Sequence, residues 1–149
     1  MAESSLDRET WMSLLAKAES DRLCALWASA GLSAAFDWVR MPETGLVMVR
    51  GRAGGTGAPF NLGEMTVTRA SLRLESGEVG HAYVAGRSKR KAEIAALCDA
   101  LLQVPARADD VRERVIRPLA EAAEAAARER AEKAGATKVE FFTLTRGGS

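Results

Sequence analysis

The hydrophobic pattern of residues 4–31 predicts two consecutive helices. The first carries an apolar stripe at helical spacing, made of Trp11, Leu14, Leu15 and Ala18. Its start can be capped by Ser4, Ser5 or Asp7. The second helix can be capped by Ser20 and ended by Gly31, and its inward residues are Leu23, Leu26 and Trp27. We therefore expect a helical N-terminal layer that packs on the rest of the chain.

Strand-like patterning follows this helical region. We expect residues 34–44 to be irregular, because Pro42 blocks a helix while three large apolar residues, Phe36, Trp38 and Met41, attach the segment to the core. Residues 46–50 begin with four consecutive apolar residues and predict a strand buried on both faces. Residues 64–74 form a longer predicted strand, and its apolar positions change from odd to even numbers. This change of phase predicts a bulge near Thr68 and Arg69.

A hairpin turn is predicted at residues 75–78, where Gly77 can adopt positive φ. The return strand, residues 79–85, has one unusually smooth face, formed by Gly80, Ala82, Val84 and Gly86. Such a face lets a helix or another chain approach closely. We expect it to be buried at least partly by another chain.

Two further helices and a last strand are predicted in the C-terminal part. Ser88 caps a helix whose apolar stripe consists of Ile94, Leu97, Cys98 and Leu101. A second helix begins at Asp109, is kinked at Pro118 and ends at Gly135. Residues 139–145 read as a strand that needs cover on both faces, because they contain two adjacent phenylalanines. The whole pattern predicts one α+β domain over residues 1–149, with an antiparallel sheet of about four strands packed with N-terminal and C-terminal helices.

The balance of charge argues against nucleic acid as a partner. Lys and Arg total 21 against 20 Asp and Glu, whereas a phosphate-backbone binder carries a concentrated basic excess. The two N-terminal helices do not suit a helix-turn-helix reader of DNA, because the second offers only Arg22 as a base. No apolar stretch approaches the length of about 20 residues needed to span a bilayer, and no signal-peptide pattern opens the chain. We expect a cytoplasmic protein without a membrane partner.

Residue types that support catalysis are scarce. The chain has a single histidine, His81, and its two cysteines, Cys24 and Cys98, are far apart in sequence. A nucleophilic triad or a zinc site needs several such groups at suitable spacing. We therefore expect buried free thiols, no cofactor and no metal site, with His81 in a structural or interface role.

A glycine-rich loop is the most unusual segment of the chain. Five glycines fall between positions 51 and 63, next to two arginines; the residues that could contact a partner or an anion are Arg50, Arg52, Gly54, Gly55 and Gly57. The loop lacks the GxxxxGK[ST] pattern and is followed by Pro59 and a strand in place of a helix. Nucleotide hydrolysis is therefore disfavoured, and partner contact is the preferred interpretation.

Several stretches of the sequence resemble PhnG, the G subunit of the bacterial carbon–phosphorus lyase system. The similarity spans roughly residues 8–145 and is carried by Arg8, Trp11-Met12 and Leu14-Leu15-Ala16, by Pro42-Glu43 with the run 45–69, by Gly80-His81-Ala82-Tyr83-Val84 with Gly86-Arg87, and by residues 99–103. The family commonly has a cysteine where this chain has Ala70, and an aspartate often stands where it has Ser88. Neither departure alters the predicted elements, since serine and aspartate both cap helices.

The resemblance implies a required but non-catalytic subunit of a core complex with the H, I and J subunits, assisted by the L subunit. The complex converts ATP and a phosphonate such as methylphosphonate to α-D-ribose 1-methylphosphonate 5-triphosphate and adenine. The I subunit is the expected seat of this chemistry. The J subunit would hold the iron–sulfur cluster, for which this chain has too few cysteines.

A second class of function stays open at this point. The glycine-rich loop, residues 51–63, could make the chain a stand-alone module that binds a small anion or a nucleotide. A module of this kind would be a well-behaved monomer that binds ATP or a phosphonate unaided, whereas a subunit would co-purify with its partners.

Overall fold

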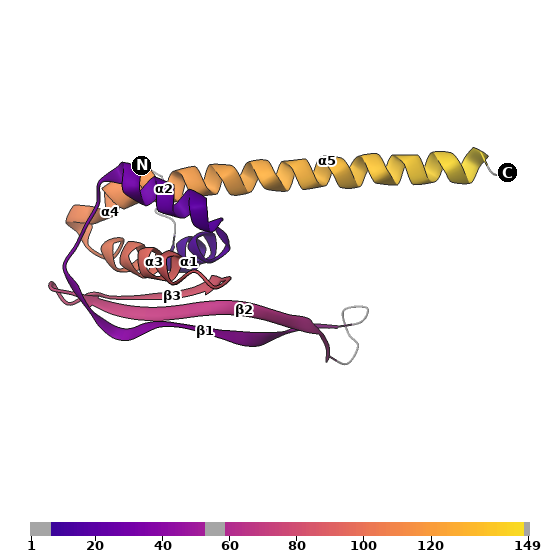
Figure 1. Cartoon of the computed structure of the whole chain (residues 1–149). Helices are drawn as coiled ribbons and strands as arrows, with labels where there is room; N and C mark the ends of the chain where they lie inside the picture. Colours follow the sequence, from indigo (N-terminus) through magenta and orange to yellow (C-terminus); the bar gives the residue numbers. More distant parts are fainter. Residues whose placement is uncertain (1–6, 53–58, 148–149) are drawn as a thin grey trace.

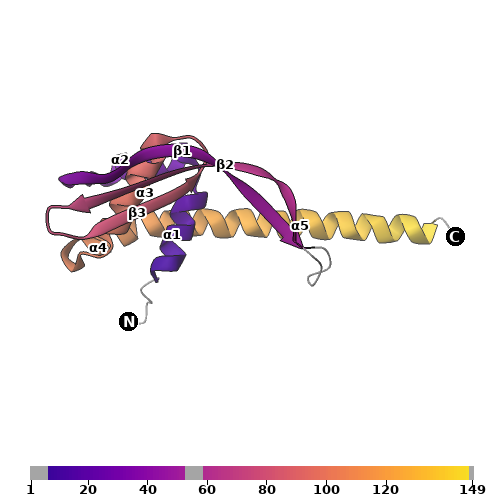
Figure 2. The same cartoon turned by 90° about the horizontal axis from the view of Figure 1, so that it is seen from below.

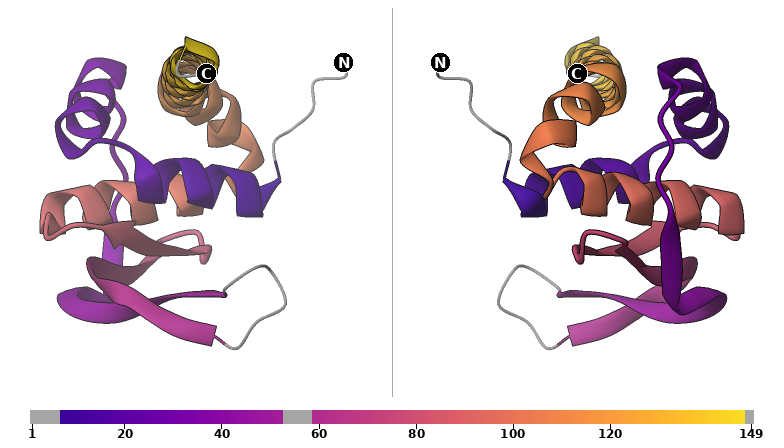
Figure 3. Two further views of the ribbon diagram at one scale, coloured as in Figure 1. Left: turned by 90° about the vertical axis from the view of Figure 1, so that its right-hand side faces the viewer. Right: turned by 90° about the vertical axis from the view of Figure 1, so that its left-hand side faces the viewer.

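The computed structural model describes residues 7–52 and 59–147, which form an antiparallel sheet covered on one face by helices (Figure 1). In chain order the elements are α1 (Arg8–Lys17), α2 (Ser20–Ala30), β1 (Phe36–Arg52), β2 (Pro59–Leu74), β3 (Val79–Ala85), α3 (Lys89–Leu101), α4 (Pro105–Val111), a π-helical turn η2 (Arg112–Ile116) and α5 (Arg117–Gly147). Helices α1 and α3 lie directly on the sheet, and α2, α4 and α5 form a further layer above them (Figure 3). The predicted α+β class is confirmed.

The N-terminal helices form as predicted. The Asp7 side chain accepts a hydrogen bond from the backbone N–H of Thr10, and this contact lowers the pKa of Asp7. Gly31 ends α2 in the left-handed conformation, with φ of 66°. One detail is wrong, because Ser20 is the first residue of α2 and Glu19 occupies the cap position.

Within residues 7–52 and 59–147 the sheet has three strands in the order β1-β2-β3, one fewer than expected. Strand β1 already begins at Phe36, so the prediction of an irregular segment over residues 34–44 is wrong for most of its length. Pro42 is accommodated because the pairing register with β2 shifts between Arg40 and Glu43. An edge strand at an irregularity is one of the few places where a sheet tolerates proline.

The predicted bulge at Thr68 and Arg69 is also misplaced. Strand β2 pairs with β3 without interruption through both residues. On the side of β1 a register shift follows directly after Arg69, but its extra residue lies in β1, and the extra residue of β2 is near Leu62. Thr68 shares the helix-facing side with Ala70, and by alternation Val67 points to the opposite face. The odd and even apolar positions therefore belong to two faces, and the period of two is maintained.

The hairpin between β2 and β3 is confirmed, with φ of 108° at Gly77. The smooth face of β3 packs against α3 of the same chain. A Cβ at Gly80 would overlap the carbonyl oxygen of Ala96 and lie 2.8 Å from the Cβ of Ala100. Because Ala82 and Val84 are already buried in the isolated chain, the expectation that another chain covers this face is wrong.

Helix α3 begins as predicted, since the Ser88 hydroxyl accepts a hydrogen bond from the Lys91 N–H at 3.0 Å. The next helix starts at Pro105, earlier than the predicted Asp109, because proline suits the first turn of a helix. From there one helical run continues into α5, and its irregularity is the π-helical turn just before Pro118. The side chains of Val111, Val115 and Leu119 are buried along this run, as expected from the apolar stripe.

The predicted final strand is wrong. Residues 139–145 belong to α5, which extends to Gly147, and Gly135 does not end the helix. A helix makes its backbone hydrogen bonds within its own segment, and residues 139–145 continue the helical run that begins at Arg117. α5 leaves the body of the molecule as a long arm on the same side as the distal parts of β1 and β2 (Figures 1 and 2).

Candidate functional site

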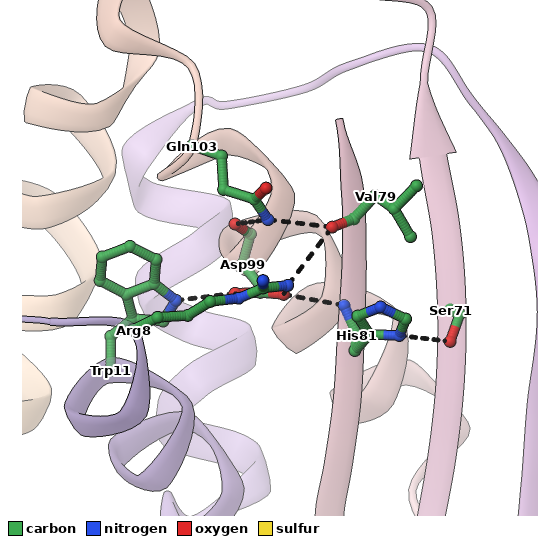
Figure 4. A network of polar contacts seen from close by, with 7 residues as sticks. All are labelled: Arg8, Trp11, Ser71, Val79, His81, Asp99 and Gln103. Carbon is green, nitrogen blue, oxygen red and sulfur yellow. Dashed lines mark hydrogen bonds and ion pairs between the residues drawn. The ribbon is translucent and has the colours of Figure 1, made fainter. Parts of the chain in front are cut away.

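The largest polar cluster surrounds Asp99, a fully buried residue of α3 (Figure 4). Its Oδ1 accepts from Arg8 Nε at 3.0 Å and from Trp11 Nε1 at 2.8 Å. Its Oδ2 accepts from Arg8 Nη2 and from the backbone N–H of His81, both at 2.8 Å. One carboxylate thus joins α1 and α3 to β3.

These contacts determine what Asp99 can do chemically. The guanidinium of Arg8 forms a bidentate ion pair with Asp99, and the carboxylate raises the pKa of the Arg8 guanidinium. Gln103 completes the cluster by donating from Nε2 to the carbonyl of Val79 at 2.9 Å and to that of Asp99 at 3.1 Å. A carboxylate that is buried and already accepts four hydrogen bonds is a structural hub and is not available to a substrate as a general base.

A second buried charge, Lys91, supports the same arrangement. Its Nζ donates to the carbonyl of Ala16 at 3.0 Å and to that of Ala85 at 3.2 Å. Burial lowers the pKa of the Lys91 amine. The ammonium therefore ties the last turn of α1 to the end of β3, where a cation complements the free carbonyls of a helix terminus. Sequence reasoning missed both Asp99 and Lys91, although each is a charged residue on an otherwise apolar helical face.

His81, the histidine singled out above, divides its contacts between the two faces of the sheet. Its backbone N–H binds Asp99, while its exposed imidazole has Nδ1 at 2.9 Å from the Ser71 hydroxyl (Figure 4). A serine–histidine pair of this kind needs a third group to orient the imidazole. Asp99 is bound to the backbone of His81 rather than to its ring, so the pair is not completed as a triad by that carboxylate.

The structure does not bring the remaining predicted site residues to His81. His81 pairs with Ser71, which pairs with Arg40, whereas Arg50 pairs with Asn61. Ten residues of β1 therefore separate the two positions, or about 30 Å at the rise of an extended strand. Arg50 is exposed near the tip of β1, and Arg52 is the last residue of that strand. Gly54, Gly55 and Gly57 lie outside the described residues.

The feature that the sequence did not reveal is an apolar ribbon. We use this name for residues 44–52 of β1 with residues 59–67 of β2, where the hairpin extends past α1 and α3 (Figure 1). Its exposed large apolar residues are Leu46, Met48, Leu62 and Met65. The prediction that residues 46–50 are buried on both faces is wrong for the isolated chain, because Leu46 and Met48 are exposed and none of the described helices covers this end of the sheet (Figure 1). Exposed apolar residues gathered in one place are typical of a protein interface.

A hollow of ≈ 260 Å³ lies where the ribbon joins the three-stranded part of the sheet. It is lined by Val67, Tyr83 and neighbouring residues, and by Glu43 and Arg69, whose side chains are 3.8 Å apart. Because the arginine faces a carboxylate, this hollow has no excess of positive charge for an anion. Within the described part of the chain, no group of His, Cys, Asp and Glu side chains is arranged to hold a metal ion.

The described helices include none that is long and apolar enough to cross a membrane. Cys24 and Cys98 are both free thiols, but only Cys98 is buried as expected, because Cys24 is partly exposed. Burial raises the pKa of the Cys98 thiol far above its ordinary value, with a further contribution from neighbouring Asp99. A thiol held protonated in this way does not act as a nucleophile.

The polar cluster around Asp99 is structural, and four of the seven exposed large apolar residues in the described part of the chain lie on a projecting ribbon. These features are typical of the class of small α+β subunits of larger assemblies. The family model described as phosphonate metabolism protein PhnG matches residues 6–147, so the chain belongs to the PhnG family. A curated relative from Rhizobium meliloti (strain 1021), named alpha-D-ribose 1-methylphosphonate 5-triphosphate synthase subunit PhnG, is 46% identical over 140 residues. The match covers 94% of this chain and 89% of the relative.

Proposed function

We propose that this chain is the G subunit of a carbon–phosphorus lyase core complex and serves the breakdown of organic phosphonates. The observation that carries the proposal is the 46% identity to a subunit of alpha-D-ribose 1-methylphosphonate 5-triphosphate synthase across 94% of the chain. The reaction is the conversion of ATP and a phosphonate such as methylphosphonate to the ribose 1-phosphonate 5-triphosphate, with release of adenine.

In this proposal the chain is required for the reaction and does not perform it alone. Asp99 is enclosed by its own donors, and the imidazole of His81 lies on an open sheet face. In the described part of the chain, His81 lines a hollow of ≈ 200 Å³, which is too small to hold ATP and a phosphonate together. The proposed partners are the H, I and J subunits, with assistance from the L subunit, in the cytoplasm.

We assign Arg50 and Arg52 to contact with a carboxylate of a partner or a phosphate of the shared substrate. Both arginines belong to the distal end of β1, and Arg50 is exposed. A guanidinium binds either group through two parallel hydrogen bonds. The glycine-rich loop between β1 and β2, with Gly54, Gly55 and Gly57, is proposed as the docking element beside them.

Co-expression with the H, I and J subunits tests the proposal. A tagged chain should capture these subunits, and the captured complex with the L subunit should release adenine from ATP and methylphosphonate. The purified chain should release none. Adenine release by the chain alone, or full activity of a complex that lacks it, would contradict the proposed role.

A further inference from the structure

The outer edge of β1 is open along its length. In the sheet order β1-β2-β3, the described residues place no neighbour on that side of β1. Every second residue of an edge strand directs its N–H and C=O away from the sheet, where they can pair with another chain. β1 spans 17 residues, which is long compared with an ordinary strand of about five or six.

The two halves of this edge differ in how well they are protected. The first half contains two register shifts, between Trp38 and Arg40 and between Arg40 and Glu43, and it contains Pro42. Bulges, prolines and charges are the features by which natural edge strands avoid pairing. From Glu43 to Val49 the register is continuous, and residues 44–49 include neither a charge nor a proline. This second half therefore remains competent to pair.

The side chains in the second half of the edge are apolar, as in a strand that is covered by other parts of a protein. Leu46 and Met48 continue the helix-facing side of the sheet that begins with Thr44, whose hydroxyl lies 3.0 Å from that of Thr68. Their exposed fractions are 62% and 50%, because α1 and α3, the two helices that lie on the sheet, end before this point (Figure 1). Val47 points to the opposite face. Both faces of the ribbon are thus apolar at the β1 edge.

The other edge of the ribbon is less suitable. Along residues 59–65, β2 has passed the end of β3, so its far edge is open as well within the described residues. That edge contains the extra residue Leu62, a positive φ of 153° at Gly63 and the charge of Glu64. These features interrupt a ladder. Only the edge of β1 offers an uninterrupted template.

We infer that residues 44–49 of β1 accept an extended strand from another subunit of the synthase, which adds to the sheet beside β1. Backbone hydrogen bonds would supply affinity, and alternate apolar side chains of the added strand would cover Leu46 and Met48. The arm of α5 projects on the same side as the ribbon, so a protein seated on the edge can also reach α5 (Figures 1 and 2). This inference rests on the proposed function, which supplies the partner.

The test compares two double variants of the tagged chain, each co-expressed with the H, I and J subunits. Leu46→Lys with Met48→Lys places charges on the open half of the edge and should lower the amount of captured subunits about tenfold. Val39→Lys with Met41→Lys is the matched control, since these residues are 58% and 67% exposed in the protected half of the same strand. Its capture should stay within about twofold of wild type.

Hydrogen–deuterium exchange distinguishes an added strand from a partner that merely covers one face. In the captured complex, alternate backbone amides of residues 44–49 should exchange more slowly than in the isolated chain, because the outward N–H groups gain acceptors. Unchanged exchange there would overturn the inference. The inference would also be overturned if exchange of these amides in the isolated chain became slow at high protein concentration. The strand added to β1 would then come from a second copy of this chain.

The two proposals fail in different ways. If the wild-type chain captures none of the H, I and J subunits, the proposed function is contradicted. If the wild-type chain captures them and the Leu46→Lys, Met48→Lys variant does so equally well, the proposed function stands and the strand addition is wrong.

Discussion

Gly80 of β3 packs directly against the carbonyl oxygen of Ala96 in α3. A Cβ at Gly80 would overlap that oxygen and lie 2.8 Å from the Cβ of Ala100. The contact sets how closely α3 lies on the sheet, and that spacing also brings Asp99 within reach of the His81 amide. The absence of a side chain at Gly80 therefore allows the buried polar cluster around Asp99 to form.

Replacing Gly80 with alanine should destabilise the chain strongly. The added methyl group meets backbone atoms, which cannot rotate away, so the free energy of unfolding should fall by about 3 kcal/mol. Gly45→Ala in β1 is the control, because a Cβ there meets nothing within 4 Å, and it should change stability by less than about 0.5 kcal/mol. Urea unfolding followed by circular dichroism measures both; equal stabilities would contradict the close packing.

Replacing Asp99 with asparagine should also be costly. The amide keeps the shape but loses the ion pair with Arg8 and turns an NH₂ group toward existing donors, so we expect a loss of about 3 kcal/mol. Asp109→Asn removes an exposed ion pair with Arg112 at 2.7 Å and should cost less than about 0.5 kcal/mol. Similar unfolding midpoints for the two variants would show that the Asp99 cluster contributes little.

The two cysteines should differ in reactivity. Cys98 is fully buried and its thiol has a raised pKa, whereas Cys24 is only partly buried. A disulfide reagent should label the Cys98→Ala variant rapidly, and the Cys24→Ser variant at least about tenfold more slowly unless it is unfolded.

The sign of the accompanying pH effect follows from the same shift. The pKa of Cys98 is higher in the folded chain than in the unfolded chain, so the protonated thiol favours the folded state. This contribution to the free energy of unfolding is complete at neutral pH, where the thiol is protonated in both states. It is lost as the pH rises above the ordinary thiol value of about 8.5. Unfolding of wild type and the Cys98→Ala variant between neutral and alkaline pH should show a steeper decline for wild type. Parallel declines would contradict the burial of the thiol.

Removing residues 136–149 tests whether the C-terminal segment is a helical arm. Among the residues whose burial is described, which end at Gly135, Leu119 is the last buried one. We therefore expect the truncated chain to keep the melting temperature of wild type while losing part of its helical circular dichroism. If residues 139–145 instead formed a strand of the sheet, the same truncation would expose core residues and lower the melting temperature.

The sequence by itself determined the local elements whose signals are contained in neighbouring residues. Asp7 and Ser88 as helix caps, Gly31 as a helix end and Gly77 in the hairpin turn were predicted correctly, because each acts on backbone groups within a few positions. The family was also recognisable from sequence, since its long motif run needs no tertiary information.

Tertiary structure alone decided which apolar runs are covered. Residues 46–50 and residues 139–145 both read as buried strands, yet the first lies on an exposed ribbon and the second continues α5. Strand and helix preferences of single residues differ by about 1 kcal/mol or less, so the surrounding structure outweighs them. The same holds for Asp99, whose four donors come from residues 8, 11 and 81 and meet only when α1, α3 and β3 pack together.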